Sequence, residues 1–316
     1  MKNAKPPAIC LLGPTASGKT DLAIEVVQRL PCEIISVDSA QIYKEMNIGT
    51  GKPDAETLAR APHRLIDFLD PAQAYSASQF RHDAVQEMEA LRDAGKIPLL
   101  VGGTMLYFRA LRDGLAKMPA SNAQVREEIL RKADREGWGA VHAALAAVDP
   151  ESAQRIHPND PQRLQRALEI YLVSGKTMTA HHQLENVAQA AADFPFQLHF
   201  FAIQPQDRAV LHNKIAARFE GMIEQGLVAE VERLYARGDL DLSMPSMRAV
   251  GYRQTWQYIA GELRFDAMVE QGTIATRQLA KRQITWMRSW ENLRSFDSDD
   301  SKTLDLLLNS ISRVAI

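Results

Sequence analysis

The sequence predicts an α/β protein with a parallel sheet that is interrupted by an all-helical insertion. Short apolar runs alternate with helical periodicity up to residue 112 and a strand pattern returns near residue 197, whereas the segment between shows helical periodicity without a convincing strand. Strands that alternate with helices indicate a parallel sheet. We therefore expect residues 1–112 and 191–316 to form one α/β core, with residues 113–190 inserted into it as a helical domain.

The first part of the core shows three strand patterns with helices between them. Residues 8–12 (AICLL) are a short apolar run that ends in Gly-Pro, and helical spacing follows at 19–30. Residues 33–37 (EIISV) and 97–101 (IPLLV) have the same apolar character, with a polar-rich helical pattern at 78–94 between them. Apolar runs of this length, bounded by turn residues, are typical of buried strands.

The second part of the core opens with one more strand pattern and continues as helices. Residues 197–203 (QLHFFAI) predict the strand. Helical segments are expected at 206–225, 227–236 and 272–290. No internal repeat or low-complexity linker divides this part further.

Length and composition place the chain among ordinary globular proteins. A length of 316 residues suits about two domains, or one large domain with an insertion. Hydrophobic residues make up 46% and charged residues 24%, which excludes disordered and low-complexity classes. The formal net charge of −2 excludes a polyanion binder that acts through bulk charge, but it leaves room for a local basic groove.

The number of cysteines and the lengths of the apolar runs indicate in which cellular compartment the protein is expected. Cys10 and Cys32 are too few for a disulfide framework, and no Cys/His cluster has the spacing of a zinc site. The run at 8–12 is shorter than the roughly 7–15 residues of a signal-peptide core. No run approaches the roughly 20 residues of a membrane span. We expect a cytoplasmic protein with no membrane association.

The most specific motif is a phosphate-binding loop. Residues 13–20 match G-x-x-x-x-G-K-[ST] without deviation, between a predicted strand and a predicted helix. The backbone amides of this loop bind anionic oxygens, Lys19 adds a positive charge, and the Thr20 hydroxyl is placed to ligate Mg²⁺. The core is therefore P-loop NTPase-like, and its ligand is a di- or triphosphate. The candidate diphosphate-binding residues are Gly13, Pro14, Thr15, Ala16, Ser17, Gly18, Lys19 and Thr20.

Other features of the chain do not favour ATP or GTP. It contains no N-K-x-D motif to read a guanine, and Gly102-Gly103-Thr104 stands where a hydrolytic ATPase carries Asp-Glu after a strand. Asp38 follows a predicted strand, so Asp38 and Thr104 are expected beside the phosphate loop. Asp38 could support Mg²⁺ in a kinase, or it could act as a general base on an attacking group. Ser39 could cap the next segment.

Several segments together resemble the bacterial tRNA dimethylallyltransferases, also called tRNA isopentenyltransferases. The resemblance covers about residues 8–290 and is specific, because an ordinary nucleotide kinase shares only the phosphate loop. The segments are GPTASGKT at 13–20, ISVDSAQIYKEMNIGTGKP at 35–53, HRLIDFLDP at 63–71, YSASQFRHDA at 75–84, PLLVGGTMLYFRAL at 98–111, HPNDPQRLQRALEIY at 157–171, AVGYRQTW at 249–256 and TRQLAKRQITWMR at 276–288.

This resemblance implies transfer of a prenyl group. Dimethylallyl diphosphate would donate its five-carbon group to N6 of adenosine 37 in tRNA, so the phosphate loop would hold an allylic diphosphate with Mg²⁺ on Thr20. Asp38 resembles the general base of the family, and Thr104 resembles a residue between base and diphosphate. Arg218, in AARFEGM, resembles the arginine that stabilises the leaving diphosphate. From the residues alone, Thr104 would cap a helix at 104–112 and Arg218 would fit a solvated helix face.

A tRNA surface is expected where basic residues gather. Residues 277–288 hold four cations and no acid, and helical spacing puts Arg277, Lys281 and Arg288 on one face. Asp160-Pro161 predicts a helix start that aims the first-turn side chains outward. The tRNA-binding candidates are Asp38, Ser39, Ala40, Gln41, Thr104, Arg126, Gln162, Arg163, Leu164, Gln165, Arg166, Met247, Arg248, Gly251, Tyr252, Arg253, Lys281, Arg282, Gln283 and Arg288.

Two other function classes remain open at this level. A nucleoside or metabolite kinase would consume ATP and lack affinity for tRNA, and a non-catalytic RNA-binding module would tolerate loss of Lys19 and Asp38. The missing second acid argues against the kinase, and the intact phosphate loop argues against the binding module. We expect a monomer, because nothing in the sequence suggests an obligate dimer. The resemblance implies that the insertion and the C-terminal helices grip the tRNA anticodon stem-loop from opposite sides.

Overall fold

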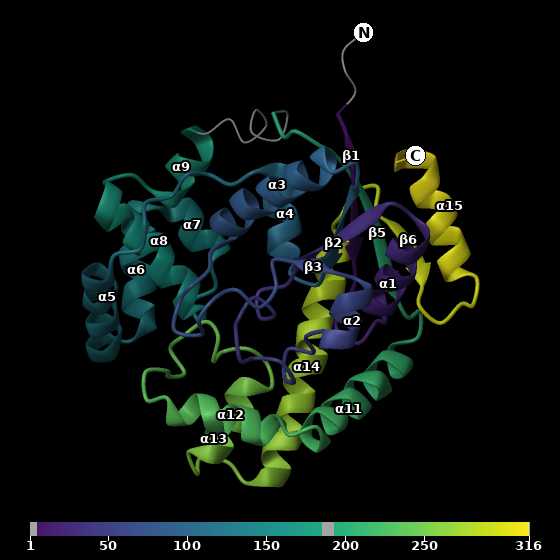
Figure 1. Ribbon diagram of the computed structural model, residues 1–316. Coiled ribbons are helices and arrows are strands. Elements are labelled where there is room, and N and C mark those ends of the chain that lie inside the picture. Colours follow the sequence, from purple (N-terminus) through teal and green to yellow (C-terminus); the bar gives the residue numbers. More distant parts are fainter. Residues whose placement is uncertain (1–4, 185–192, 316) are drawn as a thin grey trace. The chain divides into compact units, whose positions relative to one another are not determined.

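The computed structural model describes residues 5–184 and 193–315, and its backbone divides into two compact units (Figure 1). One unit comprises Met1–Arg112 with Phe194–Ile316, and the other comprises Asp113–Asp193. The expected end of the insertion at residue 190 lies outside the described residues, as does the start of the N-terminal segment.

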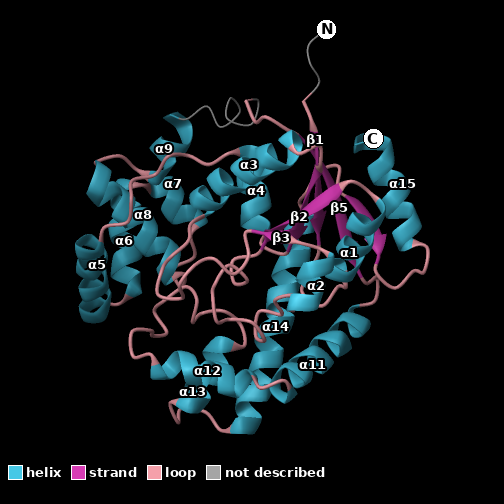
Figure 2. Ribbon diagram, in the orientation of Figure 1, coloured by secondary structure: helices cyan, strands magenta, loops and turns pink. Residues whose placement is uncertain are grey.

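A six-stranded parallel sheet forms the centre of the first unit (Figure 2). The strand order is β3-β2-β4-β1-β5-β6, and every neighbouring pair is parallel. The chain leaves β1 for β2 on one side and leaves β4 for β5 on the other, so the topological switch lies at β1 and β4. Ligands of open α/β sheets bind at such a point, outside the strand carboxyl ends. The strands are β1 (Pro7–Leu12), β2 (Cys32–Val37), β3 (His63–Arg64), β4 (Ile97–Gly102), β5 (Gln197–Gln204) and β6 (Arg294–Asp297).

Helices cover both faces of this sheet, and the alternation of side chains along β1 shows how. Cys10 and Leu12 pack toward α3 (Ala77–Asp93) and α4 (Met105–Asp113). Ile9 and Leu11, one position out of phase, pack toward α1 (Lys19–Arg29) and α15 (Thr303–Ala315). Because successive strand residues point to opposite faces, a strand covered on both sides is apolar throughout.

The helices between β5 and β6 form a third core beyond the carboxyl ends of the strands. Residues Ile42, Tyr43 and Met46, which follow β2, pack with Phe219, Val231 and Trp256 of these helices. Figure 1 shows α14 running from this group toward the sheet, where Met287 joins the core of the first face. The helices of this core are α11 (Arg208–Glu224), α12 (Leu227–Ala236), α13 (Tyr252–Ile259) and α14 (Phe265–Arg288). The short helix α2 (Ala55–Arg60) has no buried residue and is not part of it.

The second unit is helical throughout its described part. Its core includes Ile129, Val141 and Leu164. The expected helix start is confirmed, because the Asp160 side chain accepts the Arg163 N–H and Pro161 is the first helical residue. The helices are α5 (Ala123–Glu136), α6 (Trp138–Val148), α7 (Pro150–Arg155), α8 (Pro161–Ser174) and α9 (Met178–Leu184).

Predicted and observed elements agree for the apolar strands and differ where the pattern is weak. All four expected strands are present, with ends shifted by at most one residue. β3 and β6 escaped prediction because β3 is very short and β6 (RSFD) is mostly polar. The helices α2, α13 and α15 also escaped, and α14 begins at Phe265 instead of residue 272. No helix in the described ranges is long and apolar enough to cross a membrane.

Candidate functional site

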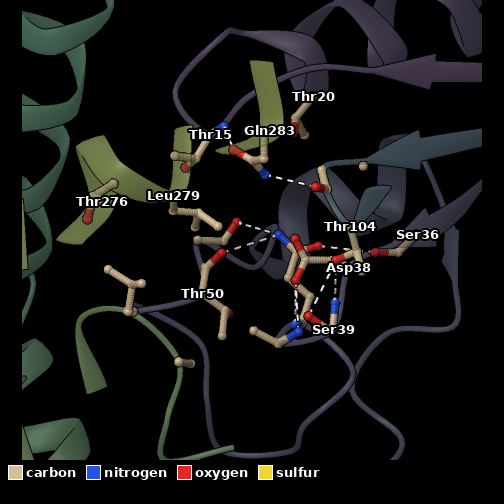
Figure 3. Close-up of a pocket in the computed structure, with 18 of the residues that line it drawn as sticks. Thr15, Thr20, Ser36, Asp38, Ser39, Thr50, Thr104, Thr276, Leu279 and Gln283 are labelled. Carbon is tan, nitrogen blue, oxygen red and sulfur yellow. Dashed lines mark hydrogen bonds between the residues drawn. The ribbon is translucent and has the colours of Figure 1, made fainter. Parts of the chain in front are cut away.

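A cavity of about 530 Å³ lies at the carboxyl ends of β1, β2 and β4 (Figure 3). Its wall combines the phosphate loop with the segment after β2, the turn after β4 and faces of α11 and α14. The expectation that Asp38 and Thr104 lie beside Lys19 and Thr20 is confirmed, since all four line this cavity. All of its lining residues belong to the first unit.

The phosphate loop curls tightly between β1 and α1. Gly18 adopts φ 77° at the start of α1, a conformation that suits glycine and few other residues. At Gly13 a Cβ atom would lie 2.5 Å from the Ile203 carbonyl oxygen, so only glycine fits there. The Lys19 Nζ donates across the loop to the Pro14 carbonyl oxygen at 3.3 Å. A diphosphate oxygen would take the place of that carbonyl.

Three charged side chains meet in this cavity and set its electrostatics. Burial lowers the pKa of Lys19 to about 8; the Asp38 carboxylate opposes this shift and the Arg218 guanidinium adds to it. The surrounding protein also lowers the pKa of Arg218, again against the effect of Asp38. An arginine keeps its proton at any physiological pH. Two cations beside one anion therefore give a cavity suited to an anionic ligand.

Backbone close to Arg218 fixes where its side chain lies. Gly51 has φ 61°, and a Cβ atom there would lie 1.9 Å from Arg218 Nη2. Glycine is therefore favoured at position 51 by its backbone conformation, and a side chain there would have to displace the Arg218 guanidinium. Arg218 is exposed on α11, as expected for a solvated helix face, and it also lines the cavity.

Asp38 presents one of its carboxylate oxygens to the cavity with no protein partner. Its Oδ1 accepts the backbone N–H groups of Ala40 at 2.8 Å and of Gln41 at 3.3 Å. These bonds form a turn directly after β2 and hold the carboxyl group in place. Oδ2 has no hydrogen bond to any residue within the described ranges. This oxygen is available to accept a proton from a bound group.

Thr104 joins the ends of β2 and β4 instead of capping α4 with its side chain. Its Oγ1 accepts the Ser39 N–H at 3.0 Å, and its own N–H donates to the Val37 carbonyl oxygen at 3.2 Å. The Thr104 carbonyl oxygen accepts the first helical bond of α4, from Tyr107. The expected helix cap is thus made by the backbone, and the hydroxyl remains next to the Asp38 turn. Ser39 caps nothing and is exposed.

Two buried polar residues, Glu230 and Gln283, shape the cavity wall. Neither was predicted to do so from the sequence. The Glu230 carboxylate accepts the backbone N–H groups of Asn47, Ile48 and Gly49 and the hydroxyl of Tyr252. Gln283, expected to contact tRNA, is 8% exposed and bonds to the phosphate loop and to the turn after β4. On its helix, each of these residues lies in a row of apolar residues that faces the core. A polar residue in such a row could have been identified from the sequence as buried.

Several tRNA-binding candidates are corrected because their side chains lie in the protein interior. Leu164 packs in the core of the second unit, and Met247 packs in the third core of the first unit. Tyr252 is fully buried, with its hydroxyl on Glu230, and Gly251 is the buried residue that begins α13.

Other candidates are half-buried or buried and have their polar groups engaged. Gln165 donates to the Arg126 carbonyl oxygen at 3.1 Å, and the Arg126 guanidinium donates to Gln165. The guanidinium of Arg166 bonds Glu169 at 2.9 Å and the Pro119 carbonyl oxygen at 2.7 Å. In the first unit, the Gln41 amide bonds the Ser36 hydroxyl and the carbonyl oxygens of Thr50 and Gly51. Gln41, Gln165 and Arg166 therefore hold the protein together.

The candidates that remain at the surface are mainly cationic. Arg163 is exposed and makes one loose ion pair with Asp160 at 3.4 Å. On α14 the expected shared face is only partly correct, because Arg277 is half-buried with its Nε covered and unbonded. The exposed candidates are Ser39, Gln162, Arg163, Arg248, Arg253, Lys281, Arg282 and Arg288.

Cation–aromatic contacts hold the end of α14 against α4. The Arg109 guanidinium lies 5.8 Å from the Trp286 ring, and that of Arg112 lies 4.2 Å from the Trp290 ring. Trp286 also lines the cavity, whereas Trp290 is buried in the core.

Both cysteines lie in the core with free thiols. Burial raises the pKa of Cys32 to about 12 and that of Cys10 further, so neither forms a reactive thiolate. Within the described residues no group of three or more His, Cys, Asp or Glu side chains could hold a metal ion. Two hydroxyl-bearing residues of the phosphate loop, Thr15 and Thr20, line the cavity.

Known proteins match this chain over most of its length. A family model described as IPP transferase matches residues 41–290. The tRNA dimethylallyltransferase of Thioalkalivibrio sulfidiphilus is 58% identical over 294 residues, which is 93% of this chain and 91% of that protein.

Solved structures match the fold as well. The full-length tRNA isopentenylpyrophosphate transferase of Bacillus halodurans is 32% identical, with a TM-score of 0.72 and coverage of 98% of this chain and 97% of that one. The corresponding enzyme of Staphylococcus epidermidis is 33% identical, with a TM-score of 0.68 and 98% coverage of both chains. A eukaryotic dimethylallyltransferase that acts on tRNA has a TM-score of 0.80 at 24% identity, covers 97% of this chain and 78% of that one, and shows the same fold.

The family model begins at residue 41, after Asp38, and spans Thr104, Arg218 and α14, which supply much of the cavity wall beyond the phosphate loop. The matches therefore extend over the site as well as the sheet. This chain belongs to the IPP transferase family.

Proposed function

We propose that this protein transfers a dimethylallyl group from dimethylallyl diphosphate to N6 of adenosine 37 in tRNA. The observation that carries the proposal is the content of one cavity, in which a diphosphate cradle with two cations lies beside a carboxylate with a free oxygen. Lys19 and Arg218 supply the cations, and Asp38 supplies the carboxylate. The relatives named above are enzymes of this reaction class.

The cradle suits the donor half of the reaction. When the bond between C1 of the prenyl group and the diphosphate oxygen breaks, its electron pair leaves with the diphosphate. The loop amides, Lys19 and Arg218 would stabilise the negative charge that builds there. Lys19, Arg218 and the loop line one cavity, so they could act together on this charge.

Asp38 suits the acceptor half. The new bond forms between N6 of the adenine and C1 of the prenyl group, and N6 then loses one proton. Asp38 Oδ2 would accept this proton, because Oδ1 is committed to the Ala40 and Gln41 N–H groups. The Asp38 turn thereby fixes which oxygen acts, and Thr104 holds the adjacent Ser39.

The residues present also fit a magnesium ion. Mg²⁺ takes few protein oxygens and usually binds through substrate phosphates and waters. Thr20 would contribute its hydroxyl beside the diphosphate. The ion would supply further positive charge to the leaving group.

The exposed cations suit an RNA partner. A base in the anticodon loop must leave its stack to enter a cavity of this kind, and the energy for this comes from contacts to the surrounding backbone. Arg248 and Arg282 line the cavity, and Lys281 and Arg288 extend the cationic surface along α14. In the second unit, Arg163 is placed to contact a phosphate. We further propose that the partner is the anticodon stem-loop and that the protein acts as a cytoplasmic monomer.

The test is prenyl transfer with labelled donor. Purified protein, Mg²⁺, unmodified tRNA and dimethylallyl diphosphate with label in the prenyl group are incubated without ATP. Label in acid-precipitable tRNA is expected, and N6-(dimethylallyl)adenosine should appear at position 37 on digestion. Folded protein that transfers no label but turns over ATP would favour the kinase instead.

Asp38→Asn is the matched variant for the base. An asparagine keeps the Oδ1 acceptor that forms the turn, but its amide nitrogen cannot take the proton. Transfer should fall by at least about 100-fold, while binding of the diphosphate changes less than threefold. Retained transfer would remove Asp38 from the proton-accepting role.

A further inference from the structure

Gln283 connects the two halves of the cavity with a single side chain. Its Oε1 accepts the Thr15 N–H of the phosphate loop at 2.9 Å, and its Nε2 donates to the Gly103 carbonyl oxygen at 2.9 Å (Figure 3). The residue lies on α14, far in sequence from both partners, and is 8% exposed. The acceptor oxygen and the donor nitrogen of this buried amide are therefore both hydrogen-bonded, as is usual for a buried polar side chain.

The turn after β4 is shaped around this amide. A Cβ atom at Gly103 would lie 2.3 Å from Gln283 Nε2 and 3.3 Å from the Gly13 carbonyl oxygen. Gly103 is therefore the contact point of three segments: the phosphate loop, the turn after β4 and α14. Thr104 follows at once and holds Ser39 next to Asp38. A shift at Gly103 would accordingly move the groups around the base.

We propose that Gln283 is a positioning residue that fixes the separation between the diphosphate cradle and the Asp38–Thr104 pair. This role rests on the proposed prenyl transfer. It also places α14, which carries the exposed Lys281, Arg282 and Arg288, in rigid connection with the phosphate loop. Gln283 also lines the cavity, and in the role proposed here it acts through its two backbone partners, Thr15 and Gly103. Its contribution is to the rate of transfer at saturation and not to the affinity for either substrate.

The first variant is Gln283→Leu, with Gln278→Leu as its matched control. Leucine fills similar space and removes both hydrogen bonds, whereas Gln278 is exposed on the same helix. A displacement of about 1 Å between reacting groups can cost about 100-fold in rate. We expect the single-turnover rate at saturating donor and tRNA to fall about 30- to 100-fold, with both dissociation constants within threefold. The control should match the wild type.

Two results would overturn the proposal. One is a single-turnover rate within twofold of the wild type in folded Gln283→Leu protein. The other is an unchanged saturated rate with a tRNA dissociation constant raised more than tenfold, which would make Gln283 a tRNA contact. Circular dichroism at the assay temperature confirms that each variant is folded, so loss of fold does not enter the comparison.

A double-mutant cycle tests the contact at Gly103 independently. Gly103→Ala alone places a methyl group against Gln283 Nε2 and should lower the saturated rate about tenfold or more. In a Gln283→Ala background that nitrogen is gone, so the same change should cost less than threefold. Residues that act through one contact show such non-additivity. Additive losses would contradict the proposed connection.

Amide hydrogen exchange separates this inference from the proposed function. The Thr15 N–H donates to Gln283, so its exchange should quicken at least tenfold in Gln283→Leu and not in Gln278→Leu. If wild-type protein transferred no prenyl group but showed this exchange difference, the proposed function would fail while the connection stood. Unchanged exchange at Thr15 would refute the connection whatever the activity.

Discussion

The pKa of Lys19 makes diphosphate binding depend on pH in a way that can be calculated. In the unliganded protein burial lowers this pKa to about 8. The cationic form therefore falls from about nine-tenths of the molecules at pH 7 to about one-tenth at pH 9. A phosphate monoester loses its last proton near pH 6, so the prenyl diphosphate keeps its full charge across this window. The dissociation constant should rise about tenfold from pH 7 to pH 9.

Diphosphate affinity should fall as the pH rises, because the diphosphate binds the cationic form of Lys19. A bound diphosphate stabilises the ammonium form and raises the pKa of Lys19, so binding above pH 8 takes up a proton. Isothermal titration calorimetry with dimethylallyl diphosphate measures the affinity directly. Repetition at pH 8.5 in buffers of different ionisation enthalpy measures the proton uptake. Both measurements are made without tRNA, so no transfer occurs.

Lys19→Arg is the control, because a guanidinium keeps its proton throughout this range. Its affinity should be nearly constant from pH 7 to pH 9, whatever its value. The reasoning is refuted if wild-type affinity changes less than twofold over the two pH units. It is equally refuted if Lys19→Arg loses affinity in parallel, since another group would then be responsible.

Four further substitutions have expected outcomes that follow from the contacts described above. Gly51→Ala should weaken donor binding about tenfold or more in calorimetry, because its methyl group would overlap the Arg218 guanidinium; unchanged affinity would show that Arg218 does not contact the donor from this position. Arg163→Ala should reduce the slope of log affinity for tRNA against log salt by about one, whereas Arg166→Ala should leave the slope unchanged and lower the unfolding free energy by about 3 kcal/mol in urea. Equal slope changes for both arginines would contradict this division. Glu230→Gln should lower the unfolding free energy by about 2 kcal/mol in the same assay, because an amide cannot accept all the donors that surround the carboxylate. A loss below 0.5 kcal/mol would show that the loop does not depend on it.

Sequence patterns predicted the four apolar strands of the sheet and the residues that meet at their carboxyl ends. Apolar runs bounded by turn residues are readily predicted as buried strands. Because parallel strands place their carboxyl ends at one edge of the sheet, Asp38 and Thr104 could be predicted to lie beside the phosphate loop. A resemblance added Arg218, which no pattern distinguishes from an ordinary helix arginine. The polar strand β6 escaped because its residues show no apolar run.

The direction of individual polar side chains was harder to predict, although the periodicity carried some information. Gln283 stands three residues after Ala280 and four before Met287, both buried, so its position belongs to the apolar stripe of α14. Glu230 stands in the same way between Leu227 and Leu234 on α12. A polar residue in such a stripe needs a buried partner, but the pattern does not reveal that partner. From the basic segment around it, Gln283 was predicted to contact tRNA. Glu230 was not predicted to have a role.

These two residues show how groups without chemistry of their own determine where the reactive groups lie. Glu230 holds the backbone of residues 47–49, and the Gln41 amide holds the carbonyl oxygens of Thr50 and Gly51 from the other side. Gly51, fixed between them, lies against the Arg218 guanidinium. The position of a cation proposed to stabilise the leaving group therefore depends on a carboxylate that never reaches the cavity. For this reason Glu230→Gln should weaken donor binding as well as stability, and by the same route as Gly51→Ala.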